Sequence, residues 1–336
     1  MPKKSIEQVE VLKGYLAKYP YAPTLTIAKA IMAHHPALFM TTESIRGKLR
    51  YYRGQQGVRN RDSLADKQFI SSPGDCSPFS TIPEGLKHFA QWAPTLLPGT
   101  KTLILGDIHS PYHDKMALTA ALEYGYAQNI DSVLLLGDVV DFHGLSKWNT
   151  DPRKRDLWLE IETTRAILQS IRDGFPKATI FAKQGNHEER YERFLWVKAP
   201  ELLNVPDFDY GRFMQFERNN IQAIADRNLM QIGGLYVIHG HEFGPMFGDP
   251  VNPARGIYNR GKAHCLCAHW HRTSHHSETS MSGKTVGCWS LGCLCDLHPE
   301  YRPVNKWNHG FAIVENLGDN DEFLVHNHVI DKGKVY

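Results

Sequence analysis

Five short apolar runs in this 336-residue chain end alike, because each leads directly into residues with carboxylate, amide or imidazole side chains. The composition and length of these runs predict buried β-strands. In open α/β sheets, ligands bind at the carboxyl ends of the strands, which is where these polar residues stand. The five stretches are TLILGDIH at 102–109, SVLLLGDVVD at 132–141, ATIFAKQGNHE at 178–188, LYVIHGH at 235–241 and AHCLCAHWH at 263–271.

The polar residues at these strand ends are of the types that hold divalent metal ions. A single Gly-Asp after a strand usually forms a turn, and a single histidine is usually packed or solvated, but five such endings are hard to explain as turns. Carboxylate, amide and imidazole ligands suit Mn²⁺, Fe, Zn²⁺ or Ni²⁺. We expect two divalent ions, with manganese the first choice, joined by one bridging carboxylate, for which Asp138 is the candidate.

The ordered set D-x-H, G-D-x-x-D, G-N-H-E, H and G/A-H-x-H resembles the calcineurin-like metallophosphoesterases, over roughly residues 101 to 315. The resemblance implies a dinuclear site in which Asp138 and Asn186 are catalytic and His187 donates a proton or stabilises charge near the leaving group. One departure from the family pattern is Ala268, which stands where glycine is usual. The implied ligands are Asp107, His109, Asp138 and His271 for one metal, and Asp138, Asn186, His239 and His269 for the other.

The order of the expected elements predicts an α/β fold. Helical patterns at 116–128 and 157–175 separate the early strands, and shorter strand-like runs follow them. This alternation favours helices layered on mixed sheets. The family resemblance implies the same architecture, a sandwich of two mixed β-sheets flanked by helices and preceded here by a small all-α domain.

Composition divides the chain into a basic helical head, a tether and a catalytic domain. Residues 1–68 hold 12 Lys and Arg against 5 Asp and Glu and contain three helical patterns. Residues 69–100 are rich in Ser, Pro and Gly, which predicts a linker with one short helix. Residues 101–336 form the expected catalytic domain.

The third helical pattern of the head suggests contact with a polyanion. Arg46, Arg50 and Arg53 recur at i, i+4 and i+7, which predicts one exposed stripe, while Ile45 and Leu49 face inward. Three short helices with such a stripe resemble a helix-turn-helix module that binds nucleic acid. A solvated face on a small helical bundle explains the pattern equally well.

Four further residues are candidates for substrate contact. His113 and His143 follow the first two strand ends, Arg190 opens the helix after GNHE, and Trp148 lies in the basic insertion at 144–157. Each of them could equally be an ordinary loop or solvated residue.

Two other features stay open at this stage. Asp141 is expected either to support a metal ligand or to cap the turn in which it lies. The two C-x-C pairs at 265–267 and 293–295 could build a structural zinc site, but C-x-C lacks the usual two-residue gap, which favours free buried thiols.

Composition excludes several other classes of protein. With 42% apolar and 22% charged residues the chain is typical of globular proteins. No apolar run approaches the ~20 residues that a membrane helix needs. The N-terminus lacks the pattern of a signal peptide, which indicates a cytoplasmic protein. A small helical N-terminal domain joined to such a catalytic domain is typical of phage-encoded proteins that act in the host cytoplasm.

These observations favour a dinuclear metal-dependent phosphoesterase that cleaves a phosphodiester in nucleic acid or a nucleotide by attack of a metal-bridged hydroxide. One alternative is a phosphomonoesterase acting on a phosphoprotein or a small metabolite, with the head as a protein-interaction module. Another is a DNA-binding regulator whose phosphoesterase body is inactive.

Overall fold

The computed structural model describes residues 3–53, 82–83, 85–86, 93–147, 151–224, 228–244, 251–318 and 321–336. The chain forms two compact units, residues 1–90 and residues 91–336. Most of the expected linker, with its predicted short helix, lies outside the described residues.

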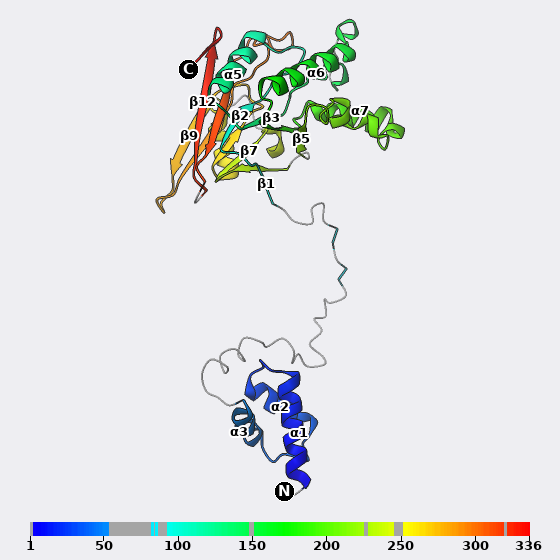
Figure 1. The fold of residues 1–336 in the computed structure, drawn as a ribbon, viewed down its shortest axis with the longest axis vertical. Helices are drawn as coiled ribbons and strands as arrows, with labels where there is room; N and C mark the ends of the chain where they lie inside the picture. Colours follow the sequence, from blue (N-terminus) through cyan, green and yellow to red (C-terminus); the bar gives the residue numbers. More distant parts are fainter. Residues whose placement is uncertain are drawn as a thin grey trace. The chain divides into compact units, whose positions relative to one another are not determined.

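The described part of the N-terminal unit contains three helices, α1 (Lys3–Lys18), α2 (Thr24–His34) and α3 (Thr42–Tyr52), drawn in blue in Figure 1. Helix α3 begins where the sequence predicts, because the Thr41 side chain accepts a hydrogen bond from Ser44 N. Its inward residues Ile45 and Leu49 are fully buried in the core of the unit. The other buried members of that core are Leu12, Ala22, Ile27, Ala28, Ile31 and Phe39.

The predicted arginine stripe on α3 is wrong in part. The Arg53 guanidinium donates hydrogen bonds to the backbone oxygens of Tyr19 (3.3 Å) and Pro20 (3.1 Å), so it is half-buried against the turn after α1 and does not continue an exposed stripe. Arg50 is exposed as predicted. The side chain of Arg46 is 30% exposed and pairs with Glu43. The sequence pattern missed the Arg53 contact because it links residues 33 or more positions apart.

The first sheet of the catalytic unit has seven strands in the order β13-β12-β11-β2-β3-β4-β5. Strands β2, β3, β4 and β5 run parallel to one another. Strands β11, β12 and β13 complete the sheet, and each pairs with its neighbours in antiparallel register. The strands are β2 (Lys101–Leu105), β3 (Ser132–Leu136), β4 (Thr179–Lys183), β5 (Ile221–Ile224), β11 (His309–Asn316), β12 (Phe323–Asp331) and β13 (Lys334–Val335).

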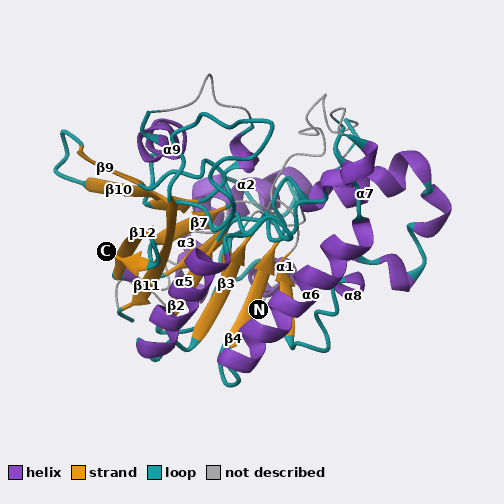
Figure 2. Cartoon of the chain, turned by 90° about the horizontal axis from the view of Figure 1, so that it is seen from above, coloured by secondary structure: helices purple, strands orange, loops and turns teal. Residues whose placement is uncertain are grey.

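The second sheet has six strands in the order β1-β6-β7-β8-β10-β9 and is also mixed. Strands β7 and β8 are parallel, whereas β9 and β10 form an antiparallel hairpin that projects from the body (Figure 2). The strands are β1 (Thr95–Leu96), β6 (Met230–Ile232), β7 (Leu235–Ile238), β8 (Cys265–Cys267), β9 (Ser274–Thr279) and β10 (Thr285–Ser290).

The two-residue period of the central strands divides the interior into two cores. In β2, Leu103 and Leu105 pack in the core beneath the helices, while Ile104 faces the second sheet. In β3, Leu134 and Leu136 likewise face Val237 and Leu266 across the interface between the sheets, which explains why the whole strand is buried. A continuous apolar run is therefore the signature of a strand covered on both faces.

Helices cover the outer faces of both sheets. Helices α5 (Lys115–Ala127) and α6 (Leu157–Gly174) run alongside β2, β3 and β4 (Figure 2) and supply apolar residues to their core. Helix α9 (Pro253–Gly261) packs on the second sheet. The other helices among the described residues are α7 (Glu188–Lys198), α8 (Tyr210–Phe213) and the 3₁₀ turns η1 (His143–Leu145), η2 (Pro152–Lys154), η3 (Pro200–Leu202), η4 (Pro206–Phe208) and η5 (His241–Phe243). The expected fold class, two mixed sheets flanked by helices, is confirmed.

Among the described helices, none is long and apolar enough to cross a membrane.

Candidate metal centre

The five polar strand ends predicted from the sequence converge at one place. Strands β2, β3 and β4 bring three of them from the first sheet, and β7 and β8 bring two from the second. Backbone hydrogen bonds join the loops: His109 N donates to Asp138 O (2.8 Å), and Ala268 N donates to His239 O (2.9 Å). The site is thus built where the carboxyl ends of strands from two sheets meet.

Backbone conformation at this site departs from what side chains ordinarily prefer. Five of the seven predicted ligands have positive φ, a region that residues other than glycine rarely adopt. Such conformations persist only where the surrounding structure holds them, and they gather at functional sites. The five values are 53° for Asp107, 49° for His109, 52° for Asp138, 70° for His269 and 55° for His271.

The glycines of the G-D and G-N-H-E motifs make room for Asp138. A Cβ at Gly185 would collide with Asp138 Oδ1, and a Cβ at Gly137 would lie 2.6 Å from His239 Nδ1. With both glycines in place, Asp138 Oδ1 accepts a hydrogen bond from His187 N (2.9 Å). That bond turns Asp138 Oδ2 toward the other predicted ligands.

Asp138 lies between the two predicted sets of ligands. Its Oδ2 is 3.3 Å from His239 Nε2 on one side and 3.8 Å from His109 Nε2 on the other. His239 Nε2 is also 3.3 Å from the side-chain oxygen of Asn186, and Asp138 and His239 group with His269 as potential ligands of one ion.

The other half of the site contains Asp107, His109 and His271. Oδ2 of Asp107 accepts a hydrogen bond from His269 N (2.8 Å), whereas its buried Oδ1 has no hydrogen-bond partner among the described residues and lies 3.4 Å from His271 Nε2. The Nε2 atoms of His109 and His271 face each other at 3.1 Å. A buried carboxylate oxygen without a donor beside two converging ring nitrogens fits a bound cation.

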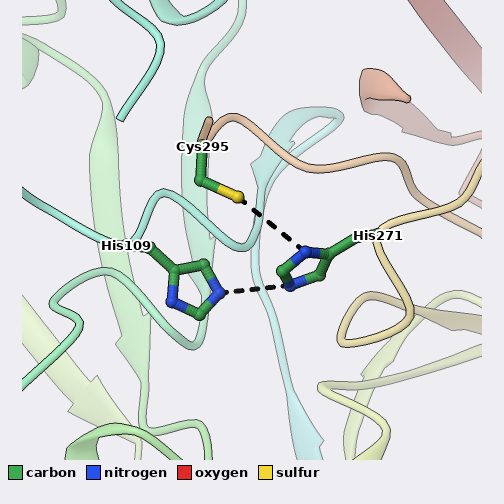
Figure 3. A group of neighbouring side chains, drawn as sticks. All are labelled: His109, His271 and Cys295. Atoms are coloured by element: carbon green, nitrogen blue, oxygen red, sulfur yellow. Dashed lines mark hydrogen bonds between the residues drawn. The ribbon is translucent and has the colours of Figure 1, made fainter. Parts of the chain in front are cut away.

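For His239 and His109, a hydrogen bond at Nδ1 determines that Nε2 faces the centre of the site. His239 Nδ1 contacts Leu136 O at 2.7 Å, and His109 Nδ1 contacts Asp141 Oδ1 at 3.1 Å, so both rings point Nε2 inward. Metal-binding histidines ordinarily give their second ring N–H to such an acceptor. His271 differs, because its Nδ1 faces the sulfur of Cys295 at 3.8 Å (Figure 3).

Carboxylates and imidazoles in the site shift one another's pKa values. Burial opposes ionisation of Asp138, but the neighbouring His187, His239 and His109 hold its pKa well below the usual range. Burial disfavours the charged form of His239, yet Asp138 and Asp107 raise its pKa to about 10. The residues therefore fit two divalent cations in donor chemistry and in charge.

His187 lies at the edge of this centre, held by two neighbours. Its Nδ1 is 2.7 Å from Asp141 Oδ1, and its Nε2 is 2.8 Å from Arg190 Nη2 and 3.8 Å from Asp138 Oδ2. The carboxylate of Asp141 thus contacts two histidines, His109 and His187. Of the two roles considered for Asp141, the structure shows contact with a predicted ligand.

Sequence reasoning missed the role of Glu188. Its buried carboxylate accepts hydrogen bonds from the backbone N–H groups of Asp138 (2.9 Å), Val139 (2.7 Å), Val140 (3.3 Å) and Gly185 (2.7 Å). It therefore joins the G-D-x-x-D loop to the G-N-H-E loop. The Glu of G-N-H-E was visible in the motif, but nothing in the sequence shows where its side chain points.

A cavity of about 330 Å³ opens over the centre. The sequence did not single out four of the residues that line it, which come from the loop after β8 and from the loop before β11. Its lining consists of His109, Asp138, Asn186, His187, His269, Trp270, His271, Tyr301, Arg302 and Trp307.

The predicted substrate contacts are only partly brought to this region. Arg190 lies beside His187, and His143 lines a second cavity next to the first. His113 lines neither cavity; its backbone pairs with Cys295 in an isolated bridge. Trp148 lies outside the described residues.

The two C-x-C pairs do not form one zinc site. Cys265 and Cys267 pack with Cys288 in the core under α9, whereas Cys295 lies beside His271. Within the described part of the chain, Cys295 is the one cysteine that belongs to a group able to hold a metal ion. The five described cysteines are free and buried, while Cys76 lies outside the described residues.

Two phage proteins are similar to the chain in sequence. The Gene 54 protein of Mycobacterium phage L5 is 22% identical over 227 residues, which cover 64% of this chain and 88% of the relative. The Gene 54 protein of Mycobacterium phage D29 is 21% identical over 229 residues, with the same coverage of 64% and 88%.

Solved structures with a similar arrangement include Vps29 from Entamoeba histolytica complexed with Zn²⁺. It is 15% identical, has a TM-score of 0.37, and the match covers 70% of this chain and 96% of that one. YfcE, a phosphoesterase from E. coli, is 14% identical with a TM-score of 0.31, covering 69% of this chain and 100% of that one.

The model of one protein family spans more than half of the chain. Residues 100–286 match the calcineurin-like phosphoesterases, and this range contains all seven predicted metal ligands. The protein therefore belongs to the calcineurin-like phosphoesterase family, whose members are metal-dependent hydrolases of phosphoesters.

Proposed function

We propose that the protein hydrolyses a phosphodiester in nucleic acid or a nucleotide with the help of two divalent metal ions. The observation that carries this proposal is the position of Asp138, whose Oδ2 lies 3.3 Å from His239 Nε2 and 3.8 Å from His109 Nε2. Two cations held close together require a shared carboxylate to offset their repulsion. The distances from Asp138 to histidines of both predicted sets support it as this shared carboxylate.

Two divalent ions bound there would supply a nucleophile at neutral pH and would neutralise the charge that develops on the phosphoryl oxygens. The chain itself positions His187 at the border of the cavity, with Asp141 on one ring nitrogen and Arg190 on the other. We assign the stabilisation of charge at the leaving oxygen to His187 together with Arg190, whose guanidinium donates to Nε2 of that ring. Manganese is our first choice of metal because the ligand set is made of oxygen and imidazole nitrogen atoms.

A diester is favoured over a monoester because two cavities adjoin the centre. The cavity over the ligands shares His109, Tyr301 and Trp307 with a second cavity of about 260 Å³. A phosphodiester carries an organic group on each side of the phosphorus, whereas a monoester carries one. One group would occupy the second cavity and the other the part of the first cavity lined by Trp270 and Arg302, so the two cavities suit the diester.

The N-terminal unit supports nucleic acid as a partner through its charge. Residues 1–68 carry 12 Lys and Arg against 5 Asp and Glu, and Arg50 is exposed on α3. We propose that this unit holds nucleic acid near the catalytic unit and so raises the local concentration of substrate. The two phage relatives support the expectation that the protein is phage-encoded.

The test is Mn²⁺-dependent hydrolysis of bis(4-nitrophenyl) phosphate compared with 4-nitrophenyl phosphate. We expect turnover of the diester that is lost in Asp138→Asn and kept in Asp173→Asn, a matched change at an exposed position of α6. Turnover confined to the monoester would replace the proposal by a phosphomonoesterase. If neither ester is hydrolysed although metals are bound, the result would favour a DNA-binding regulator whose phosphoesterase domain is inactive.

A further inference from the structure

The second cavity has a lining unlike that of the metal centre. It measures about 260 Å³. Pockets for drug-sized ligands range from about 300 to 1,000 Å³, so this one has room for a single ring system. Its lining consists of His109, Tyr112, Asp141, His143, Lys154, Cys295, Asp296, Pro299, Glu300, Tyr301 and Trp307.

Aromatic rings form much of its wall. Trp307 lies between this cavity and the metal centre, with its ring 4.2 Å from that of His271 and 6.3 Å from that of Tyr301. Tyr112 lines the cavity too, 5.8 Å from the ring of His143. Flat aromatic walls recognise flat rings, because each base or aryl group has a face that stacks on them.

Three carboxylates and one lysine line the same cavity. Asp141, Asp296 and Glu300 line it, Glu300 pairs with Lys154, and Oδ1 of Asp296 accepts a hydrogen bond from His298 N. A further phosphate group would be repelled there, whereas a neutral ring that presents N–H groups would find hydrogen-bond acceptors. Carboxylates accept hydrogen bonds from the amino group of cytosine in this way.

We infer that this cavity, defined by Tyr112, Tyr301, Trp307 and Asp296, binds the nucleobase of a nucleotide whose phosphate lies at the metal centre. The inference rests on the proposed function and narrows its substrate class to nucleotides or nucleotide ends with an amino-bearing base. It also explains why the cavity adjoins the ligands, since a base and its phosphate are separated by one sugar.

The test compares nucleotides that differ in one group. Binding of cytidine 5′-monophosphate, uridine 5′-monophosphate and ribose 5-phosphate to the Mn²⁺-loaded protein is measured by calorimetry. We expect cytidine monophosphate to bind about 5- to 150-fold more tightly than ribose 5-phosphate, the effect of stacking one base on an aromatic side chain. Uridine monophosphate, with a carbonyl in place of the amino group, binds more weakly than its cytidine counterpart.

Two variants separate stacking from hydrogen bonding. Tyr301→Ala removes most of the advantage of the base, whereas Tyr126→Ala, a tyrosine on α5 with the same 70% exposure, keeps it. Asp296→Asn keeps the stacking but reduces the difference between cytidine and uridine monophosphates. Unchanged melting temperatures for these exposed positions show that the fold is intact.

The outcomes distinguish this inference from the proposed function. Equal affinity for cytidine monophosphate and ribose 5-phosphate, with hydrolysis of the aryl diester intact, would overturn the base site and leave the phosphodiesterase standing. A base preference lost in Tyr301→Ala, without any hydrolysis of a phosphoester, would support the base site and overturn the catalytic proposal.

Discussion

Replacing Gly106 by alanine would place a methyl group against Ala268, the residue that departs from the family pattern. The new Cβ would lie 2.8 Å from the Cβ of Ala268, about 0.6 Å short of the 3.4 Å at which ordinary van der Waals contact begins. Gly106 does not have positive φ, so its backbone accepts alanine and the contact alone decides the cost. Overpacking of this kind costs about 1–3 kcal/mol of unfolding free energy.

The collision also affects the metal centre, because Gly106 and Ala268 each directly precede a predicted ligand. Asp107 follows Gly106, His269 follows Ala268, and the two ligands are joined by the 2.8 Å bond from His269 N to Asp107 Oδ2. A shift of about 0.6 Å exceeds the ~0.5 Å within which a site must be held. We expect weaker Mn²⁺ binding as well as lower stability.

A double-mutant cycle measures the contact directly. Urea unfolding and Mn²⁺ titration are carried out on the wild type, Gly106→Ala, Ala268→Gly and the double variant. We expect Gly106→Ala to cost at least 1 kcal/mol less when residue 268 is glycine, because the collision is then absent. If Gly106→Ala costs the same in both backgrounds, the collision with Ala268 is not the cause and the reasoning fails.

Three further predictions concern single contacts. Burial raises the pKa of Glu160 to about 7, so the folded protein holds this proton more tightly than the unfolded chain does. The free energy of unfolding therefore falls as the pH rises from about 4.5 to 7. We expect Glu160→Gln to remove this part of the fall, measured by urea unfolding at several pH values. Glu188→Gln leaves backbone N–H groups without an acceptor and lowers unfolding free energy by about 1–3 kcal/mol, with weaker Mn²⁺ binding in calorimetry. Arg53→Ala destabilises the N-terminal unit by about 1–2 kcal/mol in thermal unfolding followed by circular dichroism, whereas exposed Arg50→Ala changes it by less than ~0.5 kcal/mol.

Each of these has a clear contrary result. A Glu160→Gln protein that loses stability between pH 4.5 and 7 as steeply as the wild type would show that this carboxyl is ionised in the fold. Full Mn²⁺ affinity in Glu188→Gln would mean that the two loops hold their shape without it. Equal stability of the Arg53 and Arg50 variants would remove the structural role of Arg53.

The strands that position the site could be predicted because their sequence pattern has one explanation. Runs such as SVLLL at 132–136 are apolar throughout, and the structure buries them between a helical layer and a second sheet. Less apolar strands escaped prediction: β9, with the sequence SHHSET, is largely exposed and, among the described strands, pairs with β10 alone. Its hydrogen bonds to β10, rather than its own pattern, define it.

The site itself was predictable at the level of residue type and order. What the sequence could not supply is the direction of side chains that act at a distance, as for Glu188, whose carboxylate reaches back 50 residues to Asp138. The walls of the cavities were missed for the same reason. Tyr301 and Trp307 belong to a loop without a motif, and only the fold brings that loop beside His271.

The central claim is that one carboxylate serves two metal ions, and metal stoichiometry tests it most directly. Equilibrium dialysis against Mn²⁺ is carried out on the wild type, Asp138→Asn and the exposed control Asp173→Asn. We predict two ions per chain for the wild type and the control, and loss of tight binding at both positions in Asp138→Asn. A wild type that binds a single ion, or an Asp138→Asn protein that retains two with unchanged affinity, would contradict the account.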